Sequence, residues 1–388
     1  MLPSNRIPYR STIMKSYQSR RRFILQSGKL VAASAVAPVT GPLILSAEKG
    51  SPNERVRFGA IGVGGRGTSI ANAARRFADV VGVCDLDTQR IERVIKGFRA
   101  QDTSKGYQEY RKLLDRKDID FVTIGTTDHW HTRVAIHAMQ AGKDVYCEKP
   151  LTLTIDEGKQ ICKVVKETGR VFQVGTQQRS EMGQKFLQAI GIIREGRIGK
   201  VQKVTCNIGG GPKGGPFKTS APPANIDWNT WLGQAPLVDY IKERCHYQFR
   251  WWYEYSGGKM TDWGAHHVDI AQWALDQNGE GQGVLSLDPL IGDHPIPLKD
   301  GMPTKDNHYN TSHNFHIRCM FPEDTEMNIV SKSKEGNGIL FEGSKGNLFV
   351  SRGKLSGEAV NGLKEKPLSS DTVSEVYKGK KTTNHMEN

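Results

Sequence analysis

A glycine-rich segment, Gly62-Val63-Gly64-Gly65-Arg66-Gly67, constrains the fold of this chain more than any other feature. An apolar run at 56–62 leads directly into it, and a helical pattern follows to about residue 77. A G-x-G-x-x-G segment between a strand and a helix gives a tight turn, close approach of the backbone to a pyrophosphate and close helix–strand packing. The helix N-terminus adds N–H donors for the phosphates. Because a tight turn alone would use some of these glycines, the interpretation depends on the surrounding pattern.

The sequence around the glycine segment alternates short apolar runs with helical stretches. Strand-like runs separated by helices of about ten to fifteen residues predict βαβ units and a doubly wound parallel sheet. Thr154 and Glu157 form a capping box at the start of one helix. The predicted strands are 56–62, 80–84, 121–125, 144–147 and 171–175, and three of the helices are 88–99, 132–141 and 154–168.

Asp85 strengthens the prediction of dinucleotide binding. It lies 23 residues after Gly62, at the end of the second predicted strand, where a carboxylate can accept hydrogen bonds from a ribose diol. The alternative is a helix N-cap, a role that Asp87 can fill instead. A carboxylate at this place repels a 2′-phosphate, so NAD is favoured over NADP.

The formal net charge of +13 is concentrated at the N-terminus. Residues 1–47 hold 7 of the 54 basic residues and none of the 41 acids, so the remainder carries 47 − 41 = +6. The rest of the chain has no run of basic residues, and we therefore expect no nucleic-acid partner.

The first 47 residues have the order of an export signal. A basic stretch precedes the apolar run 30–45, and Ser19-Arg20-Arg21-Arg22-Phe23-Ile24-Leu25 is similar to a twin-arginine signature. The alternative is a basic leader followed by a buried helix, which Pro38 and Pro42 would break. We expect an exported, periplasmic protein that uses the twin-arginine machinery. Leu45 is not the small residue expected before a cut after Ala47, so an uncleaved membrane anchor stays open.

The six cysteines show neither a CxxC pair nor zinc-like spacing. We interpret them as structural thiols and leave disulfides open.

Three further segments carry a family resemblance. Glu148-Lys149-Pro150 and 127–131 (TDHWH) each follow a predicted strand, and 257–269 (GGKMTDWGAHHVD) lies in the second half. Together with the glycine segment they resemble the glucose-fructose oxidoreductase, inositol 2-dehydrogenase and MocA (Gfo/Idh/MocA) family, in its exported twin-arginine subgroup. The resemblance runs from about Val56 to Val350.

The resemblance implies an α/β protein with two domains behind the signal segment 1–47. The first, 54–175, is an NAD-binding Rossmann domain, and the second, 176–388, is an α/β domain with an open, mostly antiparallel sheet. The second domain is expected to bind substrate and to form a homo-oligomer, either a dimer or a tetramer. Thr127 departs from the family, which usually has proline there. The chain ends where the family's last conserved helix begins, so we expect a truncation that removes the segment bracing the first domain.

The resemblance also implies the cofactor contacts. These are Gly62, Gly64, Gly65, Arg66, Gly67, Asp85, Thr126, His129, His131, Glu148 and Lys149.

Oxidation of a secondary alcohol needs a base and a donor to the reacting oxygen. The family's lysine corresponds to Lys149, whose alternative is an ordinary exposed Glu-Lys pair. Asp262, His266 and Asp269 have i, i+4, i+7 spacing, so on one helix they would share a face. His266 is the candidate acid/base, and Asp262 is expected to hold its tautomer or to bind a substrate hydroxyl.

Further residues are candidates for the substrate site. Arg250 and Trp251 lie in the aromatic-rich segment 247–253, whose rings can stack on a pyranose or belong to the core. The other candidates are Gln178, Arg179 and Asp269. A competing interpretation makes His266, His267 and Asp269 metal ligands. Adjacent histidines on a helix do not converge, so we expect no metal.

These observations favour an NAD-dependent oxidoreductase of a sugar, polyol or sugar derivative. Export makes a tightly bound cofactor necessary, since free NAD is scarce outside the cytoplasm. The alternatives are a redox-neutral glycosidase, lyase or epimerase that works through a transient keto-sugar, and a sugar-binding protein without catalysis.

Overall fold

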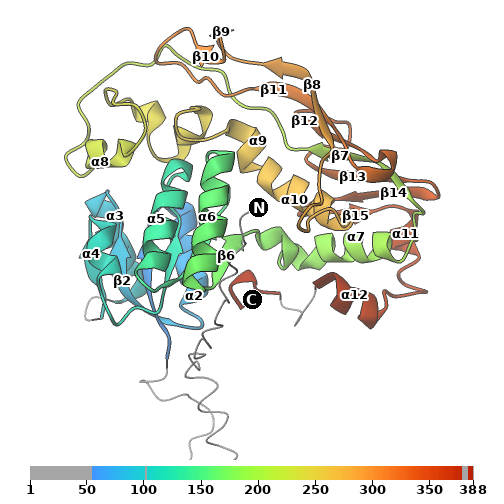
Figure 1. Cartoon of the computed structure of the whole chain (residues 1–388), viewed down its shortest axis with the longest axis horizontal. Coiled ribbons are helices and arrows are strands. Elements are labelled where there is room, and N and C mark those ends of the chain that lie inside the picture. Colours follow the sequence, from blue (N-terminus) through green and yellow to red (C-terminus); the bar gives the residue numbers. More distant parts are fainter. Residues whose placement is uncertain (1–54, 101–102, 378–382, 388) are drawn as a thin grey trace, which may run out of the picture. The chain divides into compact units, whose positions relative to one another are not determined.

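The first domain is a parallel six-stranded sheet with helices on both faces (Figure 1). The computed structural model describes residues 55–100, 103–377 and 383–387, all within the unit Pro52–Asn388. The predicted signal segment, 1–47, lies outside the described residues. The strand order is β3-β2-β1-β4-β5-β6, and each neighbouring pair is parallel. In sheets of this order a dinucleotide binds where the order reverses, between β1 and β4. The strands are β1 Arg57–Ile61, β2 Asp79–Cys84, β3 Lys105–Tyr107, β4 Phe121–Ile124, β5 Asp144–Glu148 and β6 Phe172–Gly175.

Local sequence signals position the helices of this domain. Asp87 caps one helix by accepting from the backbone N–H of Gln89, and the predicted capping box of Thr154 and Glu157 is present. One helix begins at Asp128, four residues before the predicted start, because Thr127 takes the extended N-cap conformation. The helices are α2 Gly65–Ala74, α3 Thr88–Phe98, α4 Tyr110–Leu114, α5 Asp128–Gln140 and α6 Ile155–Thr168.

Two hydrophobic clusters lie on opposite faces of the sheet. Ala71 of α2 and Val94 of α3 pack with Val83 on one face, and Val134 of α5 packs with Ile124 on the other. Burial on both faces explains why the strands read as continuous apolar runs rather than as alternating patterns.

The second domain has a seven-stranded sheet in the order β15-β14-β13-β7-β12-β11-β8. All of its neighbouring pairs are antiparallel except β12 with β7. The predicted fold class is thus confirmed for both domains. The strands are β7 Val201–Asn207, β8 Ser286–Asp293, β11 Asn314–Met320, β12 Glu326–Val330, β13 Gly338–Gly343, β14 Gly346–Val350 and β15 Leu355–Ser356, with a separate pair of β9 Leu298–Lys299 and β10 Met302–Pro303.

Two helices of the second domain pack against this sheet. Phe186 and Ile190 on α7 and Ile270 on α10 are fully buried in a cluster with Phe341 and Leu348 of the sheet. The helices of this domain are α7 Lys185–Arg194, α8 Trp228–Leu232, α9 Gly258–Asp262, α10 Gly264–Ala274, α11 Glu358–Asn361 and α12 Ser370–Tyr377.

The C-terminal residues contact the first domain. The buried His385 ring pairs with the carbonyl oxygen of Val174 in β6 at 2.9 Å, and Gln173 donates to the His385 carbonyl at 2.7 Å. Met386 packs against the cluster beneath α2 and α3. Residues 385 and 386 therefore contact the first domain, and the expected truncation stays a prediction.

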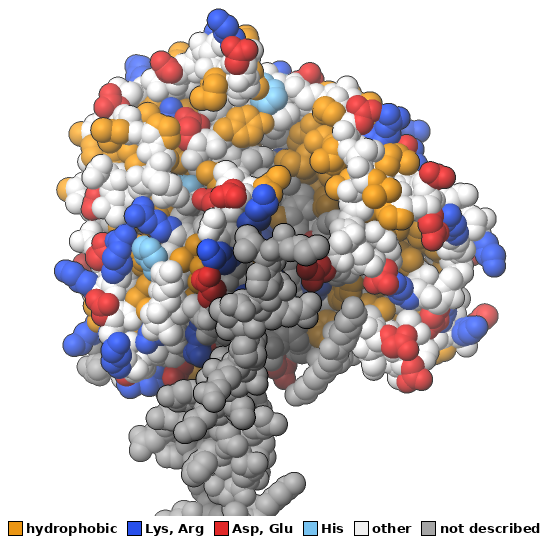
Figure 2. Space-filling view, viewed as in Figure 1, with side chains coloured by type: hydrophobic (Ala, Val, Ile, Leu, Met, Phe, Trp, Pro, Cys, Tyr) orange, Lys and Arg blue, Asp and Glu red, His pale blue; other side chains and the backbone are white. Residues whose placement is uncertain are grey.

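Lys and Arg side chains are interspersed with Asp and Glu on the face that Figure 2 shows. Within the described chain, no helix combines the length and the apolar character that crossing a membrane requires.

Candidate active site

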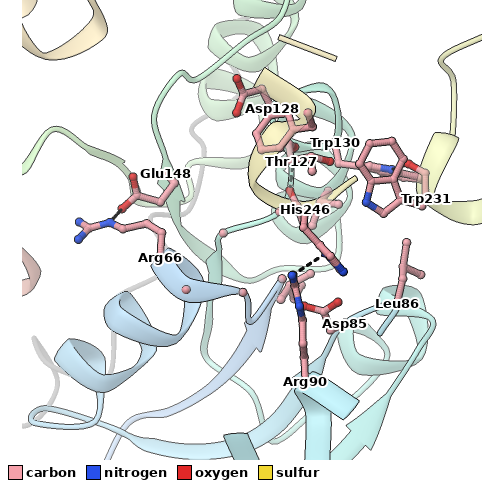
Figure 3. Close-up of a pocket in the computed structure, with 18 of the residues that line it drawn as sticks. Arg66, Asp85, Leu86, Arg90, Thr127, Asp128, Trp130, Glu148, Trp231 and His246 are labelled. Atoms are coloured by element: carbon pink, nitrogen blue, oxygen red, sulfur yellow. Dashed lines mark hydrogen bonds and ion pairs between the residues drawn. The ribbon is translucent and has the colours of Figure 1, made fainter. Parts of the chain in front are cut away.

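A cavity of about 560 Å³ lies at the carboxyl ends of β1, β2, β4 and β5. Its wall combines the glycine segment of the first domain with aromatic and basic side chains of the second (Figure 3). Ten of the predicted site residues lie on this wall: Gly62, Gly64, Gly65, Arg66, Asp85, Thr126, Glu148, Lys149, Arg250 and Asp262.

The glycines have separate roles in this wall. Gly62 has a φ of +74°, and a Cβ there would lie 2.5 Å from the backbone nitrogen of Thr126. A Cβ on Gly67 would lie 1.7 Å from the carbonyl oxygen of Gly62, so this glycine allows α2 to pack on β1. A Cβ on Gly65 would meet nothing within 4 Å. Gly67 is therefore a packing residue rather than a contact, whereas Gly65 leaves open space on the cavity wall.

The N-terminus of α2 fits a dinucleotide phosphate. Its N-cap is Gly64, and no side chain caps the helix. The first N–H groups of a helix lack partners within the helix and attract anions. With open space at Gly65, these donors suit a pyrophosphate.

Asp85 follows β2 on the same wall. Its Oδ2 accepts from the N–H of Val63 at 2.8 Å, and its Oδ1 accepts from the N–H of Asp87 at 3.0 Å. Burial raises the pKa of Asp85, although Arg90 and these two donors favour the charged form. A carboxylate has about four acceptor sites, so two remain for a ribose diol.

The second domain covers this end of the cavity, which the sequence did not predict. Asn225 donates to Oδ1 of Asp87 at 2.7 Å, and its carbonyl accepts from Thr88 at 3.1 Å. Nδ1 of His246 lies 2.5 Å from Nη2 of Arg90, and Figure 3 shows the two side chains meeting beside Asp85. Burial and the nearby Arg90 lower the pKa of His246 to about 4.

Aromatic side chains form another part of the wall. Nε1 of Trp130 donates to the carbonyl of Trp231 at 3.0 Å, which ties α5 to α8. Tyr247 and Phe249, from the predicted aromatic segment, also line the cavity. Trp251 does not, because it is buried in the neighbouring core and donates to Gln248. The prediction that Trp251 contacts substrate is therefore not supported by its position.

Lys149 and Asp262 meet at the far end of the cavity. Nζ of Lys149 donates to Oδ1 of Asp262 at 2.7 Å and to its carbonyl at 2.9 Å. Nε of Arg250 lies 3.7 Å from the other carboxylate oxygen. Burial alone would raise the pKa of Asp262, but Lys149 and Arg250 outweigh it and leave that pKa below its usual range. The alternative of an exposed Glu-Lys pair does not match the structure. The Lys149 side chain is only 14% exposed, and it is hydrogen-bonded to Asp262 of the second domain.

His266 differs from the prediction. The helix is interrupted at Trp263, between α9 and α10, and Asp262 directs its carboxylate to Lys149. His266 lies behind the cavity wall, 6% exposed, and its Nδ1 is buried without a hydrogen-bond partner among the described residues. Burial, with Lys149 and Arg352 nearby, lowers its pKa to about 2. The imidazole is thus neutral, and the expected support from Asp262 is absent.

Three other predicted residues, Gln178, Arg179 and Asp269, make internal contacts instead of lining the cavity. Arg179 pairs through two hydrogen bonds with Asp269, at 2.6 and 2.8 Å. Oε1 of Gln178 accepts from Arg352 at 2.9 Å, and its amide lies 3.4 Å from the carbonyl of His266.

The competing metal site does not assemble, because Asp269 is bound to Arg179 and the His267 ring faces Asn337. A group of three or more His, Cys, Asp or Glu side chains suited to a metal ion does not occur among residues 55–100, 103–377 and 383–387.

The two predicted cofactor histidines support the wall from behind. His129 is hydrogen-bonded through Nε2 to the carbonyl of Trp231 at 3.1 Å. His131 bridges the carbonyls of Pro150 and Thr126, at 2.7 and 3.3 Å. Both are 1% exposed and hold the turns that carry the cavity residues.

Glu148 lines the cavity beside the glycine segment. Its Oε1 accepts from Arg66 at 2.8 Å and from Gln177 at 2.7 Å, while Oε2 is buried without a partner in the described structure. An orphaned carboxylate oxygen at a cavity wall suits a donor from a bound molecule.

Comparisons with known proteins agree with this geometry. Residues 56–176 match an oxidoreductase family described as an NAD-binding Rossmann fold, and residues 215–366 match the C-terminal alpha/beta domain of the same family. A glycosyl hydrolase family 109 protein of Shewanella pealeana is 30% identical over 47% of this chain and 44% of its own length. Inositol 2-dehydrogenase of Salmonella typhimurium is 30% identical over 37% of this chain and 43% of its own length. The matches thus span less than half of each relative.

Among solved structures, the WlbA dehydrogenase of Bordetella pertussis, in complex with NADH and UDP-GlcNAcA, superposes with a TM-score of 0.57. The superposition covers 86% of this chain and 85% of that one, at 18% identity. Levoglucosan dehydrogenase gives a TM-score of 0.57 over 78% of this chain and 76% of its own, at 19% identity. At these identities the likeness shows the fold.

Proposed function

The chain belongs to the Gfo/Idh/MocA family of oxidoreductases and carries its NAD-binding Rossmann domain, and from this premise we propose that it oxidises a secondary alcohol of a sugar, polyol or sugar derivative. The observation that carries the proposal is the Lys149–Asp262 pair, 2.7 Å apart, on the wall of the cavity that also holds the glycine segment and Asp85. Hydride transfer from an alcohol requires a dinucleotide site next to groups that bind the reacting oxygen. This cavity combines such a site with an ammonium group and a carboxylate.

NAD fits the residues on the wall. The α2 N-terminus and Gly65 would hold the pyrophosphate, Asp85 the adenosine ribose and Glu148 the nicotinamide end. When bound, the nicotinamide accepts a hydride from the substrate carbon. NADP fits less well, because a 2′-phosphate would face the Asp85 carboxylate.

Lys149 is the group placed to contact the reacting oxygen. Its hydrogen bonds to the carboxylate and the carbonyl of Asp262 fix its direction, and we assign it as the hydrogen-bond donor to the substrate oxygen. Donation to the substrate oxygen stabilises negative charge as the hydroxyl proton leaves, and the same hydrogen bond polarises the product carbonyl. Arg250, on the other side of Asp262, is positioned to bind a neighbouring hydroxyl.

His266, four residues after Asp262, carries a neutral imidazole behind the wall of the cavity. Its orphaned Nδ1 supplies a lone pair or a proton donor that no residue of the described structure uses. Burial, with Lys149 and Arg352 nearby, lowers its pKa, so it would accept the alcohol proton only while Lys149 stabilises the developing alkoxide.

The test is to identify nucleotide that co-purifies with the full chain and to follow nicotinamide absorbance during a screen of sugars and polyols. We expect bound NAD whose absorbance changes with at least one sugar. A nucleotide-free protein that also fails to bind added NAD would contradict the proposal. The non-catalytic alternative predicts sugar binding without any change in the nicotinamide.

A redox-neutral reaction is the second candidate, because a relative at 30% identity is a glycosyl hydrolase family 109 protein. In this reaction the cofactor oxidises a sugar, and cleavage, elimination or epimerisation follows at the activated neighbouring carbon. The hydride then returns, so that the cofactor is unchanged after each cycle. Product release from a nitrophenyl glycoside without net NADH would favour it over the dehydrogenase.

We also propose export by the twin-arginine route, on the basis of the Ser19–Leu25 segment. A protein exported folded can carry its cofactor with it, which suits a redox-neutral cycle. Cell fractionation of the chain with Arg20→Lys and Arg21→Lys tests this. We expect retention in the cytoplasm, and unchanged export would contradict the route.

A homo-oligomer is the proposed assembly. Strand β8 lies at the edge of the open sheet. Leu287 on this strand is 64% exposed, and Leu285, just before the strand, is 70% exposed. Apolar exposure along a sheet edge favours pairing with a second copy. Light scattering on the wild-type chain and on Leu285→Asp with Leu287→Asp tests it, with loss of the oligomer expected.

A further inference from the structure

Positive charge exceeds negative charge around the Lys149–Asp262 pair. Together with the pair itself, five cationic side chains and three carboxylates interact here, of which Lys259, Arg352 and Glu181 lie outside the residues that line the cavity. The cations are Arg66, Lys149, Arg250, Lys259 and Arg352, and the carboxylates are Glu148, Glu181 and Asp262.

Three of the cations have carboxylate partners within 4 Å. Arg66 pairs with Glu148, and Lys149 and Arg250 share Asp262. Lys259 and Arg352 have no such ion pair with any part of the described chain. Their charges are therefore compensated only at longer range.

The two unpaired cations meet on one aromatic ring. Cζ of Arg352 lies 4.4 Å from the ring centre of Trp263, and Nζ of Lys259 lies 5.7 Å from it. Nε of Arg352 donates to Gln178, which fixes the guanidinium and leaves its two terminal nitrogens without a hydrogen-bond partner in the described part of the chain. Trp263 joins α9 to α10 between Asp262 and His266, so both cations lie beside the proposed reaction centre.

This arrangement is electrostatically unfavourable without a ligand. Burial lowers the pKa of Lys259, and the nearby Arg250 and Lys149 lower it further against the attraction of Asp262. Burial also lowers the pKa of Arg352, with Arg66 as the next contribution. Half-buried cations that repel one another are stabilised by a bound anion.

We propose that Arg352 and Lys259, arranged around Trp263, bind an anionic group of the substrate, so that the substrate is an acidic sugar bearing a carboxylate or a phosphate. The inference rests on the proposed function for the sugar part of the ligand. The planar fork of an arginine matches two oxygens of either group, and the lysine adds a point charge.

The test compares matched acidic and neutral probes on the NAD-loaded full chain. D-glucuronate and glucose 6-phosphate are each titrated against D-glucose by calorimetry, and the two acids distinguish a carboxylate site from a phosphate site. We expect at least one acid to bind about tenfold or more tightly than glucose. Arg352→Gln and Lys259→Gln should each remove most of that preference while glucose binding stays the same, and Arg352→Lys should restore part of it.

Lys354→Gln is the matched control. This exposed lysine lies two residues from Arg352, on the Phe349 ring, and its removal changes the net charge equally. We expect it to leave the preference unaltered. Thermal unfolding of each variant separates misfolding from lost binding, and Lys259→Gln keeps the test valid if Arg352→Gln does not fold.

Three outcomes would overturn the proposal. The first is equal binding of acids and glucose, including no measurable binding of any acid. The second is a preference that survives both substitutions. The third is a loss of NAD affinity in Arg352→Gln as large as its loss of acid affinity, which would mean that Arg352 binds the cofactor instead of the substrate. NAD affinity of the wild-type chain is measured separately, so failure of the proposed function is distinguishable from failure of the anion site.

Discussion

The ammonium nitrogen of Lys149 lies 2.7 Å from the Asp262 carboxylate and 2.9 Å from the carbonyl of the same residue. Lys149 follows β5 of the first domain, and Asp262 ends α9 of the second, so one side chain joins the two domains at the cavity. This contact fixes the direction of the lysine side chain. Because the Asp262 carboxylate is bonded to Lys149, it does not orient the His266 ring as the sequence predicted.

Lys149→Met should therefore abolish catalysis without loss of cofactor. The substitution keeps the length of the side chain and removes the donor, so we expect kcat to fall by about 10²- to 10⁴-fold. The dissociation constant for NAD should change by less than about threefold, as measured by fluorescence titration. Lys163→Met, on the exposed face of α6, is the control. Turnover retained by Lys149→Met would contradict the role of this lysine as donor.

Asp85→Asn should relax the preference for NAD over NADP. Loss of the carboxylate charge removes repulsion of a 2′-phosphate, and we expect the ratio of kcat/KM for the two cofactors to fall by about tenfold, or ~1.4 kcal/mol. Asp79→Asn, at the opposite and exposed end of β2, is the matched control. An unchanged ratio in Asp85→Asn would assign the preference to another residue.

Gly67→Ala and Gly65→Ala should separate packing from cofactor binding. The new Cβ at 67 would lie 1.7 Å from a backbone oxygen, so we expect a loss of more than about 3 kcal/mol in the free energy of unfolding. At 65 it meets open space, so stability should change by less than about 1 kcal/mol while NAD affinity falls. Urea unfolding and NAD titration measure both. Equal stability of the two variants would show that α2 can move away from β1.

Local sequence is enough to place several of the predicted site residues at one edge of the sheet. The glycine segment, Asp85 and Lys149 each follow a strand, and strands of a parallel sheet end at one edge, so these residues meet by topology. Other contacts join residues that are far apart in the sequence. Arg90 and His246 are separated by 156 positions, and Gln178 and Arg352 by 174 positions. No local pattern predicts such pairs, because loop paths across the second domain decide them.

His266 shows a different limit of the sequence. Its i, i+4 spacing from Asp262 predicts a contact only on a continuous helix, and the interruption at Trp263 has no proline or capping signal in the sequence. Lys149 and His266 also compete for the Asp262 carboxylate. A buried carboxylate is stabilised more by an ammonium group than by a neutral imidazole. Asp262 therefore pairs with Lys149, a charged residue from a distant segment, and not with His266, the partner that helical spacing alone predicts.

Stability should fall when the pH is lowered from 7 to 5. Burial lowers the pKa of His129 and His267 to about 4, against an ordinary value of 6.5. Both imidazoles are neutral in the folded chain, so the unfolded chain takes up protons first, and stability is lost as the pH falls from about 6.5 toward 4. The expected loss at pH 5 is about 2 kcal/mol for each of these residues. Urea unfolding at the two pH values measures it.

His267→Gln tests the assignment of this pH dependence. The variant should be less stable at pH 7 but should lose about 2 kcal/mol less between pH 7 and 5 than the wild-type chain. His308→Gln, at a half-exposed histidine, should leave the slope unchanged. The same slope in His267→Gln and the wild-type chain would mean that other groups govern the acid sensitivity.

Release of the cofactor should depend on the contacts that cover Asp85. Asn225 and His246 of the second domain bind Asp87 and Arg90 of the first, at 2.7 and 2.5 Å. Because these contacts must open before the adenosine end can leave, Asn225→Ala combined with His246→Ala should speed NADH dissociation by about tenfold or more in stopped-flow fluorescence. Asn229→Ala combined with His308→Ala changes the same residue types away from Asp87 and Arg90 and should dissociate at the wild-type rate. Identical rates in both double variants would mean that the cofactor leaves by a path that these contacts do not close.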